Sequence, residues 1–140
     1  KIRFAKYYTN HNGCPGYFTN NKSYAFAKKS KKLYENPVYV LVNENTQSSL
    51  EFVCMKLQSS PLVKVIGETT SGALGGVVFF DLKDINNVPI TSYSVCYLDN
   101  TCIYHNGVRI DYNIKFTIDD IKNKKDVILD KALELLNNNN

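Results

Sequence analysis

Two adjacent serines, Ser48 and Ser49, stand in "VLVNENTQSSLEF" where an apolar strand-like segment turns into an apolar helix-like segment. A serine on such a turn projects its hydroxyl clear of the sheet, and the amides that begin the helix can stabilise a developing oxyanion. These residues therefore have the chemistry of a nucleophile and its oxyanion donor. The same letters also match a capping box, in which Ser48 and Glu51 satisfy backbone amides of the first turn. Spacing alone does not decide between the two interpretations.

The elements that would position Ser48 form a βαβ unit. Residues 37–43 and 63–68 are short apolar runs rich in β-branched side chains, typical of strands covered on both faces. Between them the spacing predicts a helix over 48–58, and this order implies a parallel pair of strands. Ligands gather at the carboxyl ends of strands in such sheets, which is where Ser48 falls. The predicted apolar face of the helix consists of Leu50, Val53, Cys54 and Leu57.

The other segments predict further strands and one closing helix. Residues 1–8 indicate a strand, the Asn- and Gly-rich stretch 9–23 indicates irregular turns, and 24–35 a short helical turn. After the glycine-rich loop "TTSGALGG", a strand is predicted at 77–82 and a hairpin at 90–105. The last helix is predicted to begin at "TIDD" and to continue through an amphipathic stripe of Val127, Ile128, Ala132, Leu135 and Leu136.

Composition places the chain among globular domains. It has 140 residues, of which 44% are hydrophobic and 12% aromatic, so the chain is long and apolar enough to bury a core. The net charge of +4 is mild, and the basic cluster at 28–32 has no aromatic platform beside it, so nucleic-acid binding is not expected. No apolar run approaches the roughly 18 residues that a membrane span needs.

The four cysteines and two histidines do not have the spacing of a metal site. There is no Cys-x-x-Cys pair and the histidines are far apart, so neither a metal nor another cofactor is expected. Cys96 and Cys102 flank the turn "YLDNT" and could face each other across a hairpin, which makes a disulfide one possibility. Cys54, in the predicted helix, is interpreted as a buried free thiol.

Three segments, in the same order, resemble the C-terminal processing (tail-specific) serine peptidases. "LYENPVYVLVNENTQSSLEF" is similar to the family's Tyr-x-x-Pro, apolar strand and Thr-x-Ser-x-x-Glu, and "VKVIGETTSGA" to its next strand and Gly-Glu-x-Thr-x-Gly loop. "IYHNGVRIDYNIKF" and the helix after it resemble the closing Gly-Val-x-Pro-Asp segment and final helix, with Ile110 where proline is usual. The resemblance covers residues 33–136, and three ordered segments are more specific than any one of them.

The resemblance implies a role for each matching residue. Ser48 takes the position of the nucleophile, and the backbone N–H of Ser49 takes that of an oxyanion donor. The implied fold is an α/β arrangement of the Clp-protease and crotonase type, with a βαβ core, a β-hairpin and a C-terminal helix. In that fold a peptide can lie alongside a strand. The loop expected to border the substrate groove contains Thr70, Ser71, Gly72 and Ala73.

Two departures from the family bear on catalysis. The processing peptidases place a general-base lysine at the position of Ala73, so a Ser–Lys dyad is not expected here. Without it the chain is more similar to the tricorn-core and retinoid-binding-protein-like branch, whose base is a histidine from an earlier segment. That histidine and a Gly-Gly turn are expected upstream of residue 1, and His11 is a weak substitute. Tyr104 replaces a glutamate of that branch, and the adjacent His105 is either a base or a surface histidine ending a hairpin.

Residues 1–136 are therefore predicted to be the C-terminal portion of a peptidase-like α/β catalytic domain, and 137–140 a disordered asparagine tail. The predicted function is a serine peptidase that acts on peptides or proteins through an acyl-enzyme. The alternative is an inactive peptidase-like module that binds extended peptides or an apolar ligand. An upstream domain or a second copy could cover an exposed strand edge. The resemblance also implies an exported or envelope location, with a cytoplasmic one left open.

Overall fold

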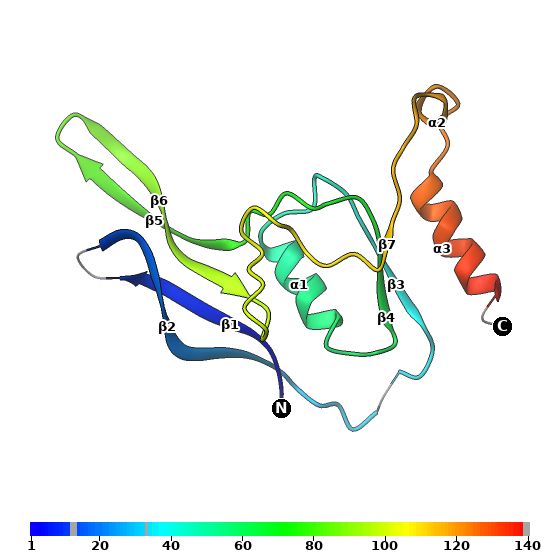
Figure 1. The fold of residues 1–140 in the computed structure, drawn as a ribbon, viewed down its shortest axis with the longest axis horizontal. Helices are drawn as coiled ribbons and strands as arrows, with labels where there is room; N and C mark the ends of the chain where they lie inside the picture. Colours follow the sequence, from blue (N-terminus) through cyan, green and yellow to red (C-terminus); the bar gives the residue numbers. More distant parts are fainter. Residues whose placement is uncertain (12–13, 33, 139–140) are drawn as a thin grey trace.

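The computed structural model describes residues 1–11, 14–32 and 34–138, which form two β-sheets with one helix between them (Figure 1). The α/β class predicted from the sequence is confirmed.

The smaller sheet contains the predicted βαβ unit. β3 (Val38–Val42) pairs in parallel with β4 (Val63–Gly67), and α1 (Ser49–Leu57) connects the two strands. The two-residue strand β7 (Tyr112–Asn113) also pairs in parallel with β4, so that the strand order is β3-β4-β7. Ser48 follows the carboxyl end of β3, as predicted.

The larger sheet is antiparallel, with strand order β2-β1-β6-β5. Its four strands are two hairpins, with bounds Ile2–His11 and Cys14–Ala27 for β1 and β2, and Gly75–Leu82 and Ile85–Cys96 for β5 and β6. β1 pairs with β6 only from Lys6↔Cys96 to Thr9↔Tyr93. The outer part of the β5–β6 hairpin therefore continues beyond the sheet as a two-stranded ribbon (Figure 1).

Two predictions about this sheet are wrong, and a third holds only in part. The described residues of 9–23 lie in β1 and β2, where register shifts accommodate the polar residues. The described residues of 24–35 contain no helix, because buried Ala25 and Ala27 on either side of exposed Phe26 have the two-residue period of a strand. The hairpin predicted at 90–105 is present only next to its turn, as an antiparallel bridge between Cys96 and Cys102 with backbone hydrogen bonds on either side, because the rest of β6 pairs with β5.

Helix α1 buries a different face from the one predicted. Its buried side carries Glu51, Cys54 and Met55, of which only Cys54 belongs to the predicted face. A carboxylate at the centre of the buried side is unexpected from hydropathy, and the reason is the set of hydrogen-bond donors described below. The exposed side carries Leu50, Val53 and Leu57.

The core has two parts. The main cluster packs α1 against both sheets, with Phe4 and Val95 from the antiparallel sheet and Val65 from the parallel one. A smaller cluster packs Ile128 and Ala132 of α3 (Val127–Asn138) against Ile66 of β4. These two clusters hold the βαβ unit from both sides.

The closing segment is two helices and not the single helix predicted. α2 (Ile118–Lys122) begins at a Thr117 capping box, as the "TIDD" signal indicated, and ends before Lys124, whose φ is +53°. α3 then begins at Val127 and extends to Asn138, two residues into the predicted tail, while residues 139 and 140 lie outside the described part of the chain. In the described residues, no helix is both long and apolar enough to span a membrane.

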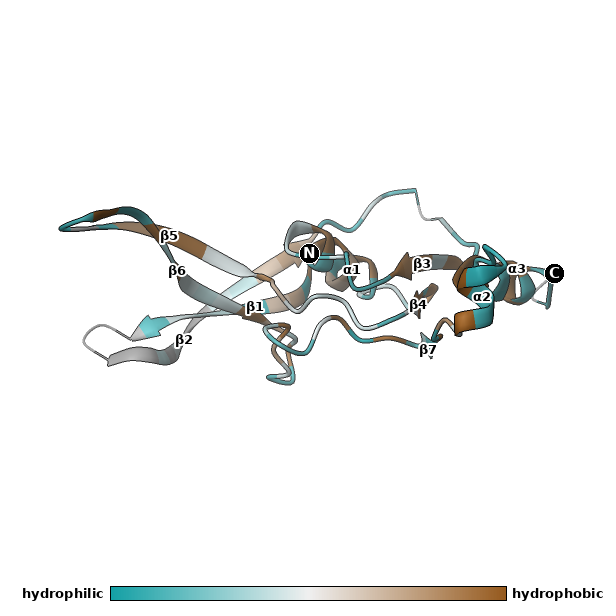
Figure 2. Cartoon of the chain, turned by 90° about the horizontal axis from the view of Figure 1, so that it is seen from above, coloured by the Kyte–Doolittle hydropathy of each residue, from teal (hydrophilic) through white to brown (hydrophobic). Residues whose placement is uncertain are grey.

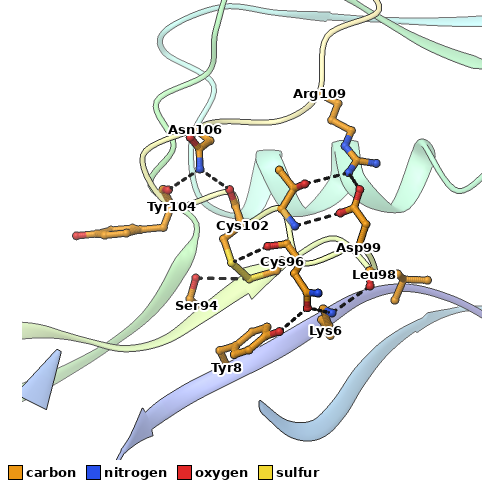
Figure 3. Close-up of a disulfide and its surroundings, with 12 residues drawn as sticks. Lys6, Tyr8, Ser94, Cys96, Leu98, Asp99, Cys102, Tyr104, Asn106 and Arg109 are labelled. Carbon is orange, nitrogen blue, oxygen red and sulfur yellow. Dashed lines mark hydrogen bonds and ion pairs between the residues drawn. A yellow bond between two sulfur atoms is a disulfide. The ribbon is translucent and has the colours of Figure 1, made fainter. Parts of the chain in front are cut away.

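Cys96 and Cys102 form a disulfide that closes the turn after β6 (Figure 3). The buried ammonium group of Lys6 donates to the Leu98 carbonyl at 3.0 Å and also to the Asn100 side chain. These contacts tie the turn to β1. Cys54 is a free, buried thiol, as predicted.

Replacing Cys96 and Cys102 with serine is expected to lower the free energy of unfolding by about 2 kcal/mol, because the disulfide closes a short loop that restricts the unfolded chain. Urea denaturation followed by circular dichroism measures the change. Dithiothreitol should lower the midpoint of the wild type and leave that of the double variant unchanged. Equal midpoints for the oxidised and reduced wild type would contradict the prediction.

Candidate active site

Ser48 forms the turn between β3 and α1 with φ 53° and ψ −116°. A non-glycine residue rarely has a positive φ, and the strain, of the order of 1–3 kcal/mol, tends to persist at functional sites. Ser48 and Glu51 have the layout of a capping box, in which the Glu51 carboxylate accepts from the Ser48 N–H at 3.0 Å. The Ser48 hydroxyl makes no side-chain capping hydrogen bond, and the residue is exposed. The structural interpretation therefore holds through Glu51, and the capping role does not use the Ser48 hydroxyl.

A cleft of about 190 Å³ opens beside Ser48, between the start of α1 and one face of the antiparallel sheet. Burial, and secondarily the nearby Tyr93, raises the pKa of Tyr7 on the sheet side, so the Tyr7 phenol stays uncharged near neutral pH. A larger cleft of about 620 Å³ lies at the other end of α1, near Gln58, and is lined by neither Ser48 nor Ser49. The cleft at the serines is lined by Tyr7, Ser48, Ser49, Phe52, Leu74, Gly75, Tyr93 and Val95.

The backbone N–H of Ser49, the first residue of α1, has no hydrogen-bond acceptor among the described residues. Amides at the start of a helix lack intrahelical partners and point toward incoming negative charge. The Ser48 N–H is already occupied by Glu51, so Ser49 supplies the available donor next to the hydroxyl. This is the arrangement that an acyl-transfer site needs at its nucleophile.

The Glu51 carboxylate is fully buried and accepts four hydrogen bonds. One oxygen accepts from the Thr70 hydroxyl at 2.6 Å and the Gly72 N–H at 2.8 Å, and the other from the N–H groups of Ser48 and Ala73, both at 3.0 Å. Charged acceptors make the stronger hydrogen bonds of proteins, and a carboxylate is favoured near a helix N-terminus. Glu51 therefore fastens the loop after β4 to the serine turn. The sequence predicted Glu51 only as part of a helix cap.

The loop residues expected to border the groove have different surroundings. Thr70 is buried, and its hydroxyl also accepts from the Val108 N–H at 3.0 Å. Gly72 has φ +64°, and a Cβ there would lie 2.9 Å from the His105 carbonyl carbon, so a larger residue is excluded. Ser71 donates through its N–H to the Thr46 carbonyl at 3.0 Å, and Ala73 is exposed. The loop residues that line the cleft are the next two, Leu74 and Gly75, which sequence reasoning did not single out.

His105 does not bond to Ser48. Its backbone N–H donates to the Gly72 carbonyl at 2.9 Å, and the centroid of its ring lies 4.0 Å from that of the Tyr104 ring. Within the described residues, no histidine or lysine side chain makes a hydrogen bond to Ser48, and the side chain of His11 lies outside them. The described residues thus place an exposed serine hydroxyl beside an amide without an acceptor, and no histidine or lysine side chain among them is bonded to either. Nor do these residues include a cluster of three or more His, Cys, Asp or Glu side chains that could hold a metal ion.

The thiol of Cys54 is not a competing nucleophile. Burial, and to a smaller extent the charge of Glu51, raises the pKa of Cys54, which disfavours the reactive thiolate. We expect a water-soluble maleimide to leave Cys54 unmodified in the native protein at neutral pH and to modify it in urea, as mass spectrometry would measure. Equal rates of modification in the two conditions would show that this part of α1 is open to solvent.

Comparison with known proteins connects this geometry to one family. The sequence pattern of peptidase family S41 matches residues 3–114. No curated protein matches the chain in sequence.

Several solved structures share the fold. A "putative peptidase" from Parabacteroides merdae superposes with a TM-score of 0.81 at 23% identity, over 96% of this chain and 42% of that one. CPAF in complex with lactacystin has a TM-score of 0.67 at 26% identity, over 80% of this chain and 23% of that one. The photosystem II D1 C-terminal processing protease has a TM-score of 0.54 at 20% identity, over 81% of this chain and 27% of that one. This chain spans less than half the length of each of these structures.

Proposed function

Because the chain belongs to peptidase family S41, we propose that it carries the nucleophile portion of a serine peptidase active site, with peptides or proteins as substrates. Ser48 is the nucleophile, and the backbone N–H of Ser49 is one oxyanion donor. The observation that supports this most directly is the strained, exposed Ser48 turn, which stands beside a cleft and is followed by an amide without an acceptor among the described residues.

In this proposal, the Ser48 hydroxyl attacks the carbonyl carbon of a peptide bond and loses its proton to a general base. The Ser49 N–H stabilises the negative charge that develops on the carbonyl oxygen. Collapse of the tetrahedral intermediate releases the amine, which takes up the proton, and leaves an acyl ester on Ser48. Water then attacks the ester, so that the acid product leaves and the hydroxyl is restored.

The base and the second oxyanion donor are proposed to come from a part of the protein outside residues 1–140. The matched structures are more than twice as long as this chain, which leaves room for such a segment. A histidine is the expected base, since Ala73 stands where the processing peptidases carry lysine. The Cys96–Cys102 disulfide favours an oxidising compartment and so supports an exported or envelope location.

A fluorophosphonate probe tests the proposal on the full-length protein. Mass spectrometry should find the probe on Ser48, and the Ser48→Ala variant should not be labelled. The Ser49→Ala variant is the matched control, because it removes a neighbouring hydroxyl and keeps the backbone N–H, so its labelling should persist. Absence of label on a wild type with native circular dichroism would overturn the assignment of Ser48.

The second candidate function is a peptide-binding module without catalysis. It is the alternative that Ala73 in place of the lysine and Tyr104 in place of a glutamate leave open, and the match to peptidase family S41 does not favour it. It requires that peptide affinity be the same in the wild type and the Ser48→Ala variant, and that bound peptide be recovered intact from both.

A further inference from the structure

The outer part of the β5–β6 hairpin is an apolar ribbon without a third strand. From Val77↔Thr91 to Leu82↔Ile85, its strands pair with each other and with no other described strand, because β1 pairs with β6 no further out than Tyr93. Figure 2 shows apolar colouring along much of β5. An isolated two-stranded hairpin is at best marginally stable in water, so exposed apolar residues on this ribbon indicate a surface that is covered during function.

One face of the ribbon is defined by alternation along β5. The register shift between Gly76 and Val77 leaves Ser92 of β6 unpaired, so β5 itself alternates without interruption and places Val78 and Phe80 on the same face as Gly76. Their cross-strand partners are Ile90 and Val88. We call these four residues the hairpin face. Val78, Ile90 and Phe80 are 38%, 46% and 51% exposed. All four side chains are apolar, so the hairpin face carries no charge.

The hairpin face is continuous with the cleft at Ser48. A Cβ at Gly76 would lie 2.0 Å from a ring carbon of Tyr93, which shows that the Tyr93 ring covers Gly76 on this face. Tyr93 lines the cleft, and so does Gly75, the first residue of β5. A polypeptide that leaves the cleft over the Tyr93 ring therefore meets Val78 and then Phe80, at about 3.3 Å of strand per residue.

We propose that the hairpin face is an exosite for the apolar side chains of extended polypeptide substrates, beyond the residues held in the cleft. This inference rests on the proposed function, since it takes the cleft at Ser48 as the place where the polypeptide is held. It assigns the substrate class as unfolded or extended polypeptides with apolar residues roughly three to six positions from the bond at Ser48, on the side that runs toward the hairpin. Continuity with the cleft favours this occupant over a second copy of the chain.

The experiment measures binding by the full-length Ser48→Ala variant, so that turnover is not needed. Two fluorescent peptides share one central segment and differ in their flanks, which are Leu- and Val-rich in one and Ser- and Gln-rich in the other. We expect the apolar flanks to tighten binding about tenfold, as burial of one or two aliphatic side chains would give. Adding Phe80→Thr and Ile90→Thr should remove this preference. The matched control adds Val77→Thr and Phe79→Thr, which lie on the opposite face of the ribbon, and should retain it.

Each outcome bears on the proposal. Equal affinity for both peptides in the Ser48→Ala protein, or loss of the preference in both pairs of variants, would overturn the exosite. A concentration-dependent dimer would also overturn the exosite if Phe80→Thr and Ile90→Thr dissociate it without changing the peptide preference. The hairpin face would then be an interface between copies of the chain. Circular dichroism verifies that the variants fold. Failure of fluorophosphonate to label Ser48 would count against the proposed catalysis, while the peptide preference would still report on the exosite.

Discussion

The Ser48→Ala substitution is expected to lower kcat for peptide hydrolysis by the full-length protein by about 10⁴- to 10⁶-fold, as removal of a serine nucleophile does in other peptidases. The cleft and the Ser49 N–H remain, so KM should change little. Initial rates with a quenched fluorescent peptide measure both constants. The Ser49→Ala variant should lose less than about tenfold, because the side chain of Ser49 has no assigned role and its amide is unchanged.

A second substitution at the same position separates catalysis from folding. At φ 53° a Cβ is strained, so Ser48→Gly should raise the free energy of unfolding by about 1 kcal/mol while it abolishes hydrolysis. Ser48→Ala keeps the Cβ and the strain, so its stability should stay near that of the wild type. Loss of stability in both variants would mean that the Ser48 hydroxyl is a structural group. Full activity in either would exclude Ser48 as the nucleophile.

The βαβ unit could be predicted from the sequence because its signals are local. The runs at 37–43 and 63–68 are β-branched and continuous, and a polar turn with two serines separates the first run from the helix. The same signals placed Ser48 at the carboxyl end of a strand. The same local reasoning gave a wrong prediction for residues 9–23. Their Asn and Gly content indicated turns, whereas the pairing between β1 and β2 determines their structure.

The cleft could not be predicted because its walls are distant in sequence. Tyr7 and Tyr93 come together only through the pairing of β1 with β6, and neither carries a motif. The prediction of which face of α1 is buried was wrong for another reason. Hydropathy places a glutamate toward solvent, and here four donors from the serine turn and the loop after β4 reverse that preference. The letters Ser-x-x-Glu predicted the bond to Ser48, while the bonds to the loop depend on tertiary structure.

The Glu51→Gln substitution should therefore have the largest effect on stability among isosteric changes at the site. Each carboxylate oxygen accepts two hydrogen bonds, so an amide nitrogen meets the N–H groups of Ser48 and Ala73 in one place and that of Gly72 in the other, and none of these can accept from it. We expect a loss of about 2–4 kcal/mol in the free energy of unfolding, because buried donors are left without partners. Urea denaturation measures it. Glu44→Gln is the matched control, since the exposed Glu44 side chain accepts a hydrogen bond from its neighbour Asn45 and from no other described residue. Its effect should stay within about 0.5 kcal/mol.

Glu51→Gln also tests whether the serine turn is held for chemistry or only for folding. At a temperature where the variant is folded by circular dichroism, one of the two acceptor oxygens is absent. Either the Ser48 and Ala73 N–H groups or the Gly72 N–H and Thr70 hydroxyl then lose their acceptor, so the serine turn is no longer fastened to the loop after β4. The rate of fluorophosphonate labelling of Ser48 should then fall by about 10- to 100-fold, since a small misplacement of a nucleophile lowers its reactivity this much. An unchanged rate in a destabilised protein would assign Glu51 to the fold alone. A fall in that rate for Glu51→Gln but not for Glu44→Gln makes Glu51 the residue that positions Ser48.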